Sequence, residues 1–244
     1  MVSSLFFLAG LLIGSFVNVI NYRLPKGLNA ISDRSKCISC NSKIPFYLNI
    51  PVISYLILKG KSKCCNSQIS IRYPIVELLI AFIFLINSMI MSEVKFAIVF
   101  SLISVIIISI IIIDYSHKII FDFMSFSLIL FGLTCTLLPY NLNPFEITFL
   151  DSLIASLFSM FLFWFLRFLF FKFKKIEALG KGDIYLIGGL SSWIGSVDFV
   201  YLLSVSSIAG IILYLLQNKT KNYEVPFGSA LGVGFLLIAY AKLF

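Results

Sequence analysis

Charged residues are scarce in this chain. Asp, Glu, Lys and Arg make up 12% of the 244 residues, hydrophobic types make up 60%, and mean hydropathy is +1.03. This balance excludes an ordinary soluble domain, in which about 25% of residues are charged, and a polytopic membrane protein fits instead. The net charge of +8 does not indicate a nucleic-acid partner, because the basic residues lie in a few loops between apolar runs.

The chain has only one histidine, and it has no evident nucleotide-binding glycine motif or internal repeat. The one histidine, His117, cannot form a histidine-rich metal centre. No Gly-x-Gly-x-x-Gly turn marks a dinucleotide site. No repeat is evident, which argues against a transporter built from inverted halves. The N-terminus has no basic segment or small-residue cleavage site, so we expect residues 4–21 to form a membrane helix and not a cleaved signal peptide.

Eight apolar runs predict an all-α polytopic membrane protein with about eight transmembrane helices. The runs cover residues 4–21, 74–92, 95–113, 123–139, 147–171, 184–197, 199–217 and 228–243. A spanning helix needs about 17 to 20 residues, so the sixth and eighth runs are short, and the sixth is tilted, extended or partly broken. We divide the chain into a first helix (1–21), a small Cys-containing basic domain (22–73) and a seven-helix membrane domain (74–244).

The basic loops predict the orientation. Nine Lys or Arg residues lie between the first two apolar runs, from Arg23 to Arg72, against one acid. Positive loops remain cytoplasmic, so this domain should be cytoplasmic. Alternation of the helices then leaves the other basic clusters on the same side and both termini outside. The same alternation places Asp114 and Asp183 at the cytoplasmic face.

These two aspartates are the strongest candidates for chemistry. Asp114 ends the third apolar run, and Asp183 ends the pattern Gly180-Lys181-Gly182-Asp183 before the sixth run. An ionisable group within a membrane segment is costly and is a functional candidate by default. Two converging carboxylates can share a proton and activate water, as in aspartic proteases. Each could instead be an ordinary helix-end acid, and we interpret Asp122 as such, as an N-cap.

The glycines around the second aspartate and one more buried acid could support this site. Gly180 and Gly182 permit unusual dihedrals and close approach of a backbone. Glu77 stands inside the second apolar run, near its cytoplasmic end. The spacings Gly10-x-x-x-Gly14 and Gly228-x-x-x-Gly232 suit close helix packing.

Four cysteines lie in the basic cytoplasmic domain: Cys37, Cys40, Cys64 and Cys65. Four thiols in one loop of a reducing compartment favour a structural metal, zinc, over disulfides. The first pair has zinc-ligand spacing, whereas the adjacent second pair is an awkward ligand set for one tetrahedral ion. Either of the latter two could be a free thiol.

Together these motifs resemble the bacterial type IV prepilin peptidases, the leader peptidase and N-methyltransferase family, over nearly the whole length. The matching segments are Gly14-Ser15-Phe16-Val17-Asn18-Val19 with Arg23-Leu24-Pro25, Cys37-x-x-Cys40 with Ile44-Pro45, Asn49 to Leu56, Ile69 to Leu79, Asp114 to Asp122, Glu177 to Asp183, and Pro226-Phe227-Gly228. Phe121 stands where the family usually has Pro. Ser62 stands where it has the third cysteine, so either Cys64 substitutes through a shifted loop or the metal site is degraded.

The resemblance implies an aspartic endopeptidase in which Asp114 and Asp183 are the catalytic pair. Its substrates would be prepilins and pseudopilins, whose basic leader is cut after a glycine at the cytoplasmic face of the inner membrane. The new N-terminus would then be methylated with S-adenosylmethionine, whose binding residues the sequence leaves unknown. Structural zinc would be a further cofactor, and membrane lipid a further partner.

Two other classes of protein stay open. A transporter could use Asp114 and Asp183 as proton or cation sites. A zinc-stabilised membrane adaptor could bind a partner or anionic lipid through its basic loop, but that role leaves the two aspartates unexplained.

Overall fold

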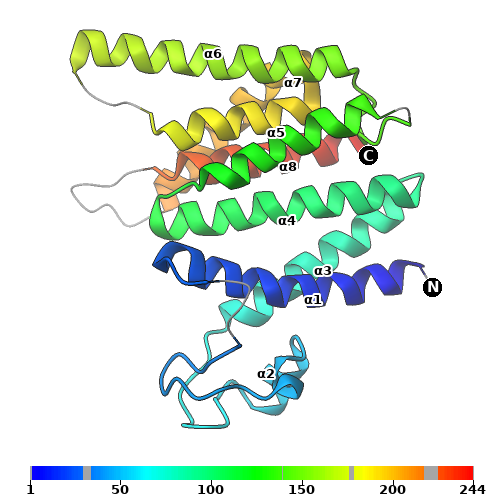
Figure 1. Cartoon of the computed structure of the whole chain (residues 1–244), viewed down its shortest axis with the longest axis vertical. Coiled ribbons are helices and arrows are strands. Elements are labelled where there is room, and N and C mark those ends of the chain that lie inside the picture. Colours follow the sequence, from blue (N-terminus) through cyan, green and yellow to red (C-terminus); the bar gives the residue numbers. More distant parts are fainter. Residues whose placement is uncertain (1, 30–33, 139, 176–178, 217–224, 244) are drawn as a thin grey trace. The chain divides into compact units, whose positions relative to one another are not determined.

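The computed structural model describes residues 2–29, 34–138, 140–175, 179–216 and 225–243, and within them the chain is helical (Figure 1). The only strand-like pairings in these residues are two isolated bridges, Lys36 with Lys43 and Lys61 with Gln68. The contacts divide the chain into two compact units, Met1–Ser101 and Leu102–Phe244. The all-α prediction is confirmed, and the three-part domain division stays a prediction.

The helices follow the predicted apolar runs closely. They are α1 (Val2–Arg23), α2 (Ile53–Ile57), α3 (Arg72–Ile90), α4 (Val94–His117), α5 (Asp122–Leu137), α6 (Phe149–Lys174), α7 (Lys181–Leu216) and α8 (Phe227–Leu243), with short 3-10 turns at Leu24–Lys26 and Phe46–Asn49. Among the described residues, five helices are long and apolar enough to cross a membrane, and α5 and α8 are shorter apolar helices. The chain is therefore a multi-pass membrane protein. Two predicted run ends, residues 139 and 217, lie outside the described residues.

In the first unit, α1 packs closely on α3. A Cβ added at Gly10 would lie 2.6 Å from the Ala81 Cα, and one at Gly14 would lie 2.8 Å from the Glu77 Cα. The two glycines therefore let the helix backbones meet without intervening side chains. This confirms the packing role predicted for the Gly10-x-x-x-Gly14 spacing.

In the second unit, α7 packs against α5, α6 and α8. The sixth and seventh predicted runs both lie in α7, whose backbone leaves helical geometry at Gly195, with φ 85° and ψ 178°. This value of φ favours glycine because other residues would be strained there. The sixth run is therefore one half of a broken helix, which was one of the forms expected for it.

The break at Gly195 leaves helix-end groups that need partners within an apolar bundle. The carboxylate of Asp151 accepts hydrogen bonds from the backbone N–H and the hydroxyl of Ser196, at 3.2 and 2.6 Å. Before the break, the carbonyl of Ser192 accepts from the Ser152 hydroxyl at 2.6 Å, and Asn143 donates to the Trp193 carbonyl at 3.2 Å. Side chains of α6 and of the loop before it thus satisfy backbone groups on both sides of the break.

The interpretation of Asp122 as an N-cap is wrong. The N-cap of α5 is Phe121, which has extended backbone and makes no side-chain capping bond, and Asp122 is already the first helical residue. An acid in the first turn still favours the helix through its interaction with the positive end of the helix dipole.

Candidate active site and metal site

Asp114 lies in the last turn of α4 and is buried, with 5% of its surface exposed. Its Oδ2 accepts a hydrogen bond from the backbone N–H of Ser229 at 2.6 Å, and the Ser229 hydroxyl lies 2.8 Å from the same oxygen. Ser229 belongs to the first turn of α8, where backbone N–H groups are free to bind an anion. The same hydroxyl lies 3.1 Å from the Ile111 carbonyl, so its single proton is shared between two acceptors, whereas the backbone N–H is committed to Asp114. These contacts fix the orientation of the carboxylate, and the N–H stabilises its charge.

Asp183 lies in the first turn of α7, next to the Gly-x-Gly turn. Its Oδ2 accepts a hydrogen bond from the backbone N–H of Gly180 at 3.2 Å. A Cβ at Gly180 would lie 3.0 Å from this oxygen. The absence of a side chain at position 180 therefore lets the carboxylate fold back over the turn.

The segments next to the two aspartates pack on Ile120, in the loop between α4 and α5. A Cβ at Gly182 would lie 2.9 Å from the Ile120 Cβ. A Cβ at Gly228 would lie 2.5 Å from the Ile120 Cδ1 and 3.2 Å from the Asp114 Cγ. The start of α7, the start of α8 and this loop therefore meet with no spare volume. The charges of Asp114 and Asp183 lie close enough to interact.

Polar residues stand at both ends of this loop: His117 ends α4 and Asp122 begins α5. His117 and Asp122 are both exposed. The positive charge of Lys118 interacts with Asp114. Lys118 has left-handed backbone, with φ 57°, and its N–H donates to the Asp114 carbonyl at 2.9 Å, which ends α4.

Sequence reasoning missed Ser229 as a partner of Asp114. The available signal was its position, because it directly follows Pro226-Phe227-Gly228 at the start of an apolar run, where a helix N-terminus is expected.

Glu77 lies in the first unit, on α3, with 8% of its surface exposed. Its Oε2 accepts a hydrogen bond of 2.7 Å from the backbone N–H of Val52. Val52 has φ 60° and ψ −50°, a strained conformation for a β-branched residue. Glu77 thus holds the loop that precedes α2 in a conformation that the chain would not adopt alone.

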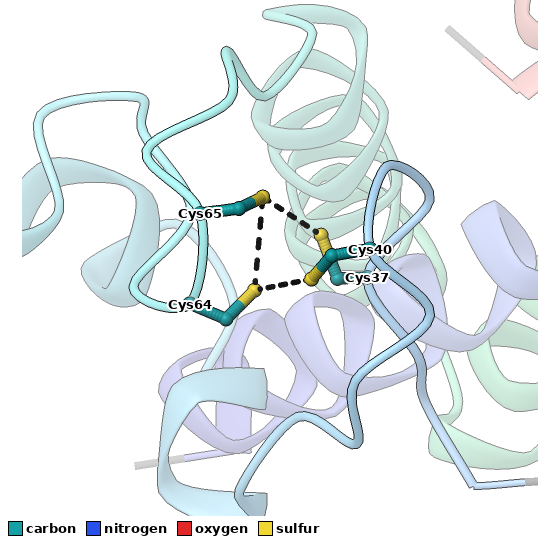
Figure 2. Close-up of side chains that lie close together, drawn as sticks. All are labelled: Cys37, Cys40, Cys64 and Cys65. Atoms are coloured by element: carbon teal, nitrogen blue, oxygen red, sulfur yellow. Dashed lines mark hydrogen bonds between the residues drawn. The ribbon is translucent and has the colours of Figure 1, made fainter.

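The four cysteines of the first unit converge, as Figure 2 shows. All four sulfur atoms lie within 4.8 Å of one another. The Sγ–Sγ distances are 3.7 Å for Cys37 and Cys65, 3.1 Å for Cys40 and Cys64, and 3.9 Å for Cys64 and Cys65. Zn–S bonds of about 2.3 Å in a tetrahedron separate the sulfurs by about 3.8 Å. The cluster therefore fits a structural metal ion.

At two of the four cysteines, Cys37 and Cys65, the surroundings favour the thiolate, the form that binds a metal. The backbone N–H groups of Cys40 and then Ser39 lower the pKa of Cys37 to about 6. The hydroxyls of Ser62 and Ser67 lower the pKa of Cys65. The fifth cysteine, Cys135, is buried in α5 and is not a member of the cluster.

Comparison with known proteins gives a consistent assignment along the chain. Residues 8–91 match the bacterial peptidase A24 N-terminal domain, and residues 100–215 match the type IV leader peptidase family. No solved structure matches the chain.

Curated relatives match over most of their lengths. A type 4 prepilin-like proteins leader peptide-processing enzyme of Escherichia coli O78:H11 is 30% identical, over 96% of this chain and 91% of that protein. The prepilin leader peptidase/N-methyltransferase of Aeromonas salmonicida (strain A449) is 31% identical, over 94% of this chain and 87% of that protein. The prepilin leader peptidase/N-methyltransferase of Vibrio cholerae serotype O1 is 30% identical, over 97% of this chain and 96% of that protein.

Proposed function

Since this chain belongs to the type IV leader peptidase family, we propose that it is a membrane aspartic endopeptidase acting on type IV prepilins and pseudopilins. Cleavage follows a glycine at the end of the basic leader, at the cytoplasmic face of the inner membrane. The observation that carries this proposal is that Gly182, next to Asp183, and Gly228, next to the partner of Asp114, both pack on Ile120, so that the two charges lie close enough to interact.

In the proposed mechanism the two carboxylates share one proton. Asp114 is the general base, because the backbone N–H of Ser229 donates to its carboxylate and stabilises the charged form. It takes a proton from the attacking water. Asp183 holds the shared proton and hydrogen-bonds the scissile carbonyl, whose oxygen gains negative charge as water attacks. Breakdown of the tetrahedral intermediate then requires a proton on the leaving amine, which the Asp114 carboxyl group can return.

Gly180 supports this chemistry by leaving the backbone before Asp183 uncovered, while Gly182 packs against Ile120. Gly180 is exposed, so an extended substrate segment can approach the turn without meeting a side chain. A glycine on the substrate side of the cut suits the same narrow approach.

We further propose that the enzyme methylates the new N-terminus, since relatives are named N-methyltransferases. S-adenosylmethionine supplies the methyl group when bound, and its residues in this chain are unassigned. In the first unit, Cys37, Cys40, Cys64 and Cys65 would hold one structural zinc ion, because their sulfur atoms are close enough for a single ion.

The orientation that we propose keeps the cysteine cluster and both aspartates cytoplasmic, with both termini outside. The basic residues between Arg23 and Arg72 support it. The same residues would contact anionic headgroups of membrane lipid.

The decisive experiment is cleavage of a prepilin by the full-length protein in membranes. Asp114→Asn and Asp183→Asn each remove one member of the pair, and each should lower the cleavage rate by about 100-fold or more. Asp122→Asn is the matched control, because Asp122 is an exposed acid at the start of α5, close to Asp114 in the sequence; it should cleave like the wild type.

Two outcomes would contradict the proposal. Full activity of either dyad variant would remove that aspartate from the mechanism. A correctly inserted wild-type protein that cleaves no prepilin would redirect attention to the aspartates as transport sites, and ion flux would then be measured.

A further inference from the structure

The cysteine cluster is built from two turns that have the same backbone structure. In the first turn, the N–H of Cys37 donates to the Ser42 carbonyl at 2.9 Å, and the N–H of Asn41 donates to the Cys37 carbonyl at 2.9 Å. In the second turn, the N–H of Ser62 donates to the Ser67 carbonyl at 2.8 Å, and the N–H of Asn66 donates to the Ser62 carbonyl at 3.0 Å.

The match extends to the residues around these bonds. Asn41 and Asn66 both have left-handed backbone, with φ 56° and 55°. An isolated antiparallel bridge closes each turn, between Lys36 and Lys43 in the first and Lys61 and Gln68 in the second. At the end of each turn a serine hydroxyl lies beside the last cysteine sulfur, at 3.0 Å for Cys40 and 3.2 Å for Cys65.

The two turns differ in where their thiols stand. The first turn reads Cys37-Ile38-Ser39-Cys40, and the second reads Ser62-Lys63-Cys64-Cys65. Ser62 therefore holds the backbone position that Cys37 holds in the first turn, and Cys64 holds the position of Ser39. Serine and cysteine have exchanged places between the first and third positions of the turn.

We infer that Cys64 supplies the fourth metal ligand in place of the residue at position 62, and that Ser62 is a positioning residue for Cys65. The inference rests on the proposed metal site. The Cys64 Sγ lies 3.8 Å from the Ser62 Oγ and 3.1 Å from the Cys40 Sγ, so it reaches the cluster from its shifted position. The Ser62 hydroxyl lies 3.1 Å from the Cys65 Sγ and 3.0 Å from the Ser67 hydroxyl.

The cysteines at the unequal positions of the two turns, Cys37 and Cys64, differ in their exposure to solvent. The residue at the first position is buried in both, with 6% of Cys37 and 9% of Ser62 exposed. Cys64, in contrast, is exposed. In the second turn, Cys64 therefore reaches the metal site from the solvent side. The Ser62 hydroxyl, at the buried position, is a hydrogen-bond partner of the ligand Cys65.

The test is a rescue experiment on purified full-length protein, with zinc content and the absorption of the cobalt-substituted site as readouts. Cys64→Ser should lose zinc or bind it far more weakly, and its cobalt complex should lose thiolate-to-metal absorption. Adding Ser62→Cys to Cys64→Ser returns a thiol to the first position and should restore one equivalent. Adding Ser70→Cys instead returns a thiol at an exposed position outside the cluster and should not restore it.

The mirror exchange in the first turn provides a second test. Cys37→Ser with Ser39→Cys gives this turn the thiol positions of the second one, and it should bind zinc where Cys37→Ser alone does not. This result does not depend on whether the Cys64 variant folds well.

The possible failures are distinguishable. A Cys64→Ser protein with full zinc content and unchanged cobalt absorption would overturn the inference while leaving a metal site. A metal-free wild type with a zinc-binding Ser62→Cys variant would show that Cys64 does not substitute. If the wild type and the Ser62→Cys variant are both folded and metal-free, the proposed zinc site itself fails.

Discussion

Asp114 and Ser229 are 115 residues apart in the sequence, yet two donors of Ser229 lie within 2.8 Å of a single oxygen of Asp114. One donor is the backbone N–H at the start of α8, and the other is the hydroxyl. The contact joins the end of α4 to the start of α8 and fixes the orientation of the carboxylate to which we assign general-base chemistry.

Ser229→Ala should lower the prepilin cleavage rate by about 10-fold, because a hydrogen bond to a charged group contributes about 1.5–3 kcal/mol and the backbone donor remains. The rate at saturating substrate should fall more than the Michaelis constant rises, since Ser229 orients a catalytic group without needing to touch substrate. Ser204→Ala is the control, because the exposed Ser204 only donates to its own helix at Val200. Equal rates for both variants would remove Ser229 from the site.

Gly228→Ala should reduce cleavage strongly, because the new methyl group would lie 2.5 Å from the Ile120 Cδ1 and 3.2 Å from the Asp114 Cγ. The paired change Ile120→Ala removes the nearest obstructing atom and should restore part of the rate. Gly210→Ala is a matched control, because a Cβ there would meet only the Ala230 Cβ at 3.5 Å, an ordinary contact. Cleavage at the wild-type rate by Gly228→Ala would show that this tight packing does not position Asp114.

Asp151→Ala should destabilise the protein by about 1–2 kcal/mol through loss of the cap on Ser196, beyond the break at Gly195. The measurement is thermal or denaturant unfolding of the detergent-solubilised protein. Glu93→Ala is the comparison, since Glu93 forms an exposed ion pair with Lys95 and such pairs contribute about 0–1 kcal/mol. An unchanged stability for Asp151→Ala would mean that the break is satisfied without this carboxylate.

A chelator that removes the proposed zinc ion should destabilise the segment between Arg34 and Arg72, because the free energy of metal binding adds to the stability of the folded cluster. Limited proteolysis should show faster cutting between Arg34 and Arg72 in treated protein. Cys37→Ser should show the same sensitivity without chelator, whereas Cys135→Ser should not, because Cys135 is no member of the cluster. Zinc-free protein that resists the protease like the zinc-loaded form would contradict a structural metal.

The sequence alone determined the class of protein and the extent of its helices. The apolar runs predicted the ends of the long helices to within a few residues, although α2 was missed and the sixth and seventh runs are joined in α7, because hydropathy and helix length are local properties that the membrane thickness selects. Asp114, Asp183 and the four cysteines were also identifiable, since a charge or a thiol pair stands out against an apolar background. The glycines at positions 10 and 14 predicted close packing through spacing alone.

Only the tertiary structure decided which partners these residues meet. The pairing of Ser229 with Asp114, the cap of Asp151 on Ser196 and the approach of Cys64 to Cys40 all join segments whose separation carries no periodic signal. Such contacts depend on how side-chain volumes fill the space between helices and on which buried polar groups remain to be satisfied. Local patterns predict the elements, but the position of one element against another follows from the packing of the whole unit.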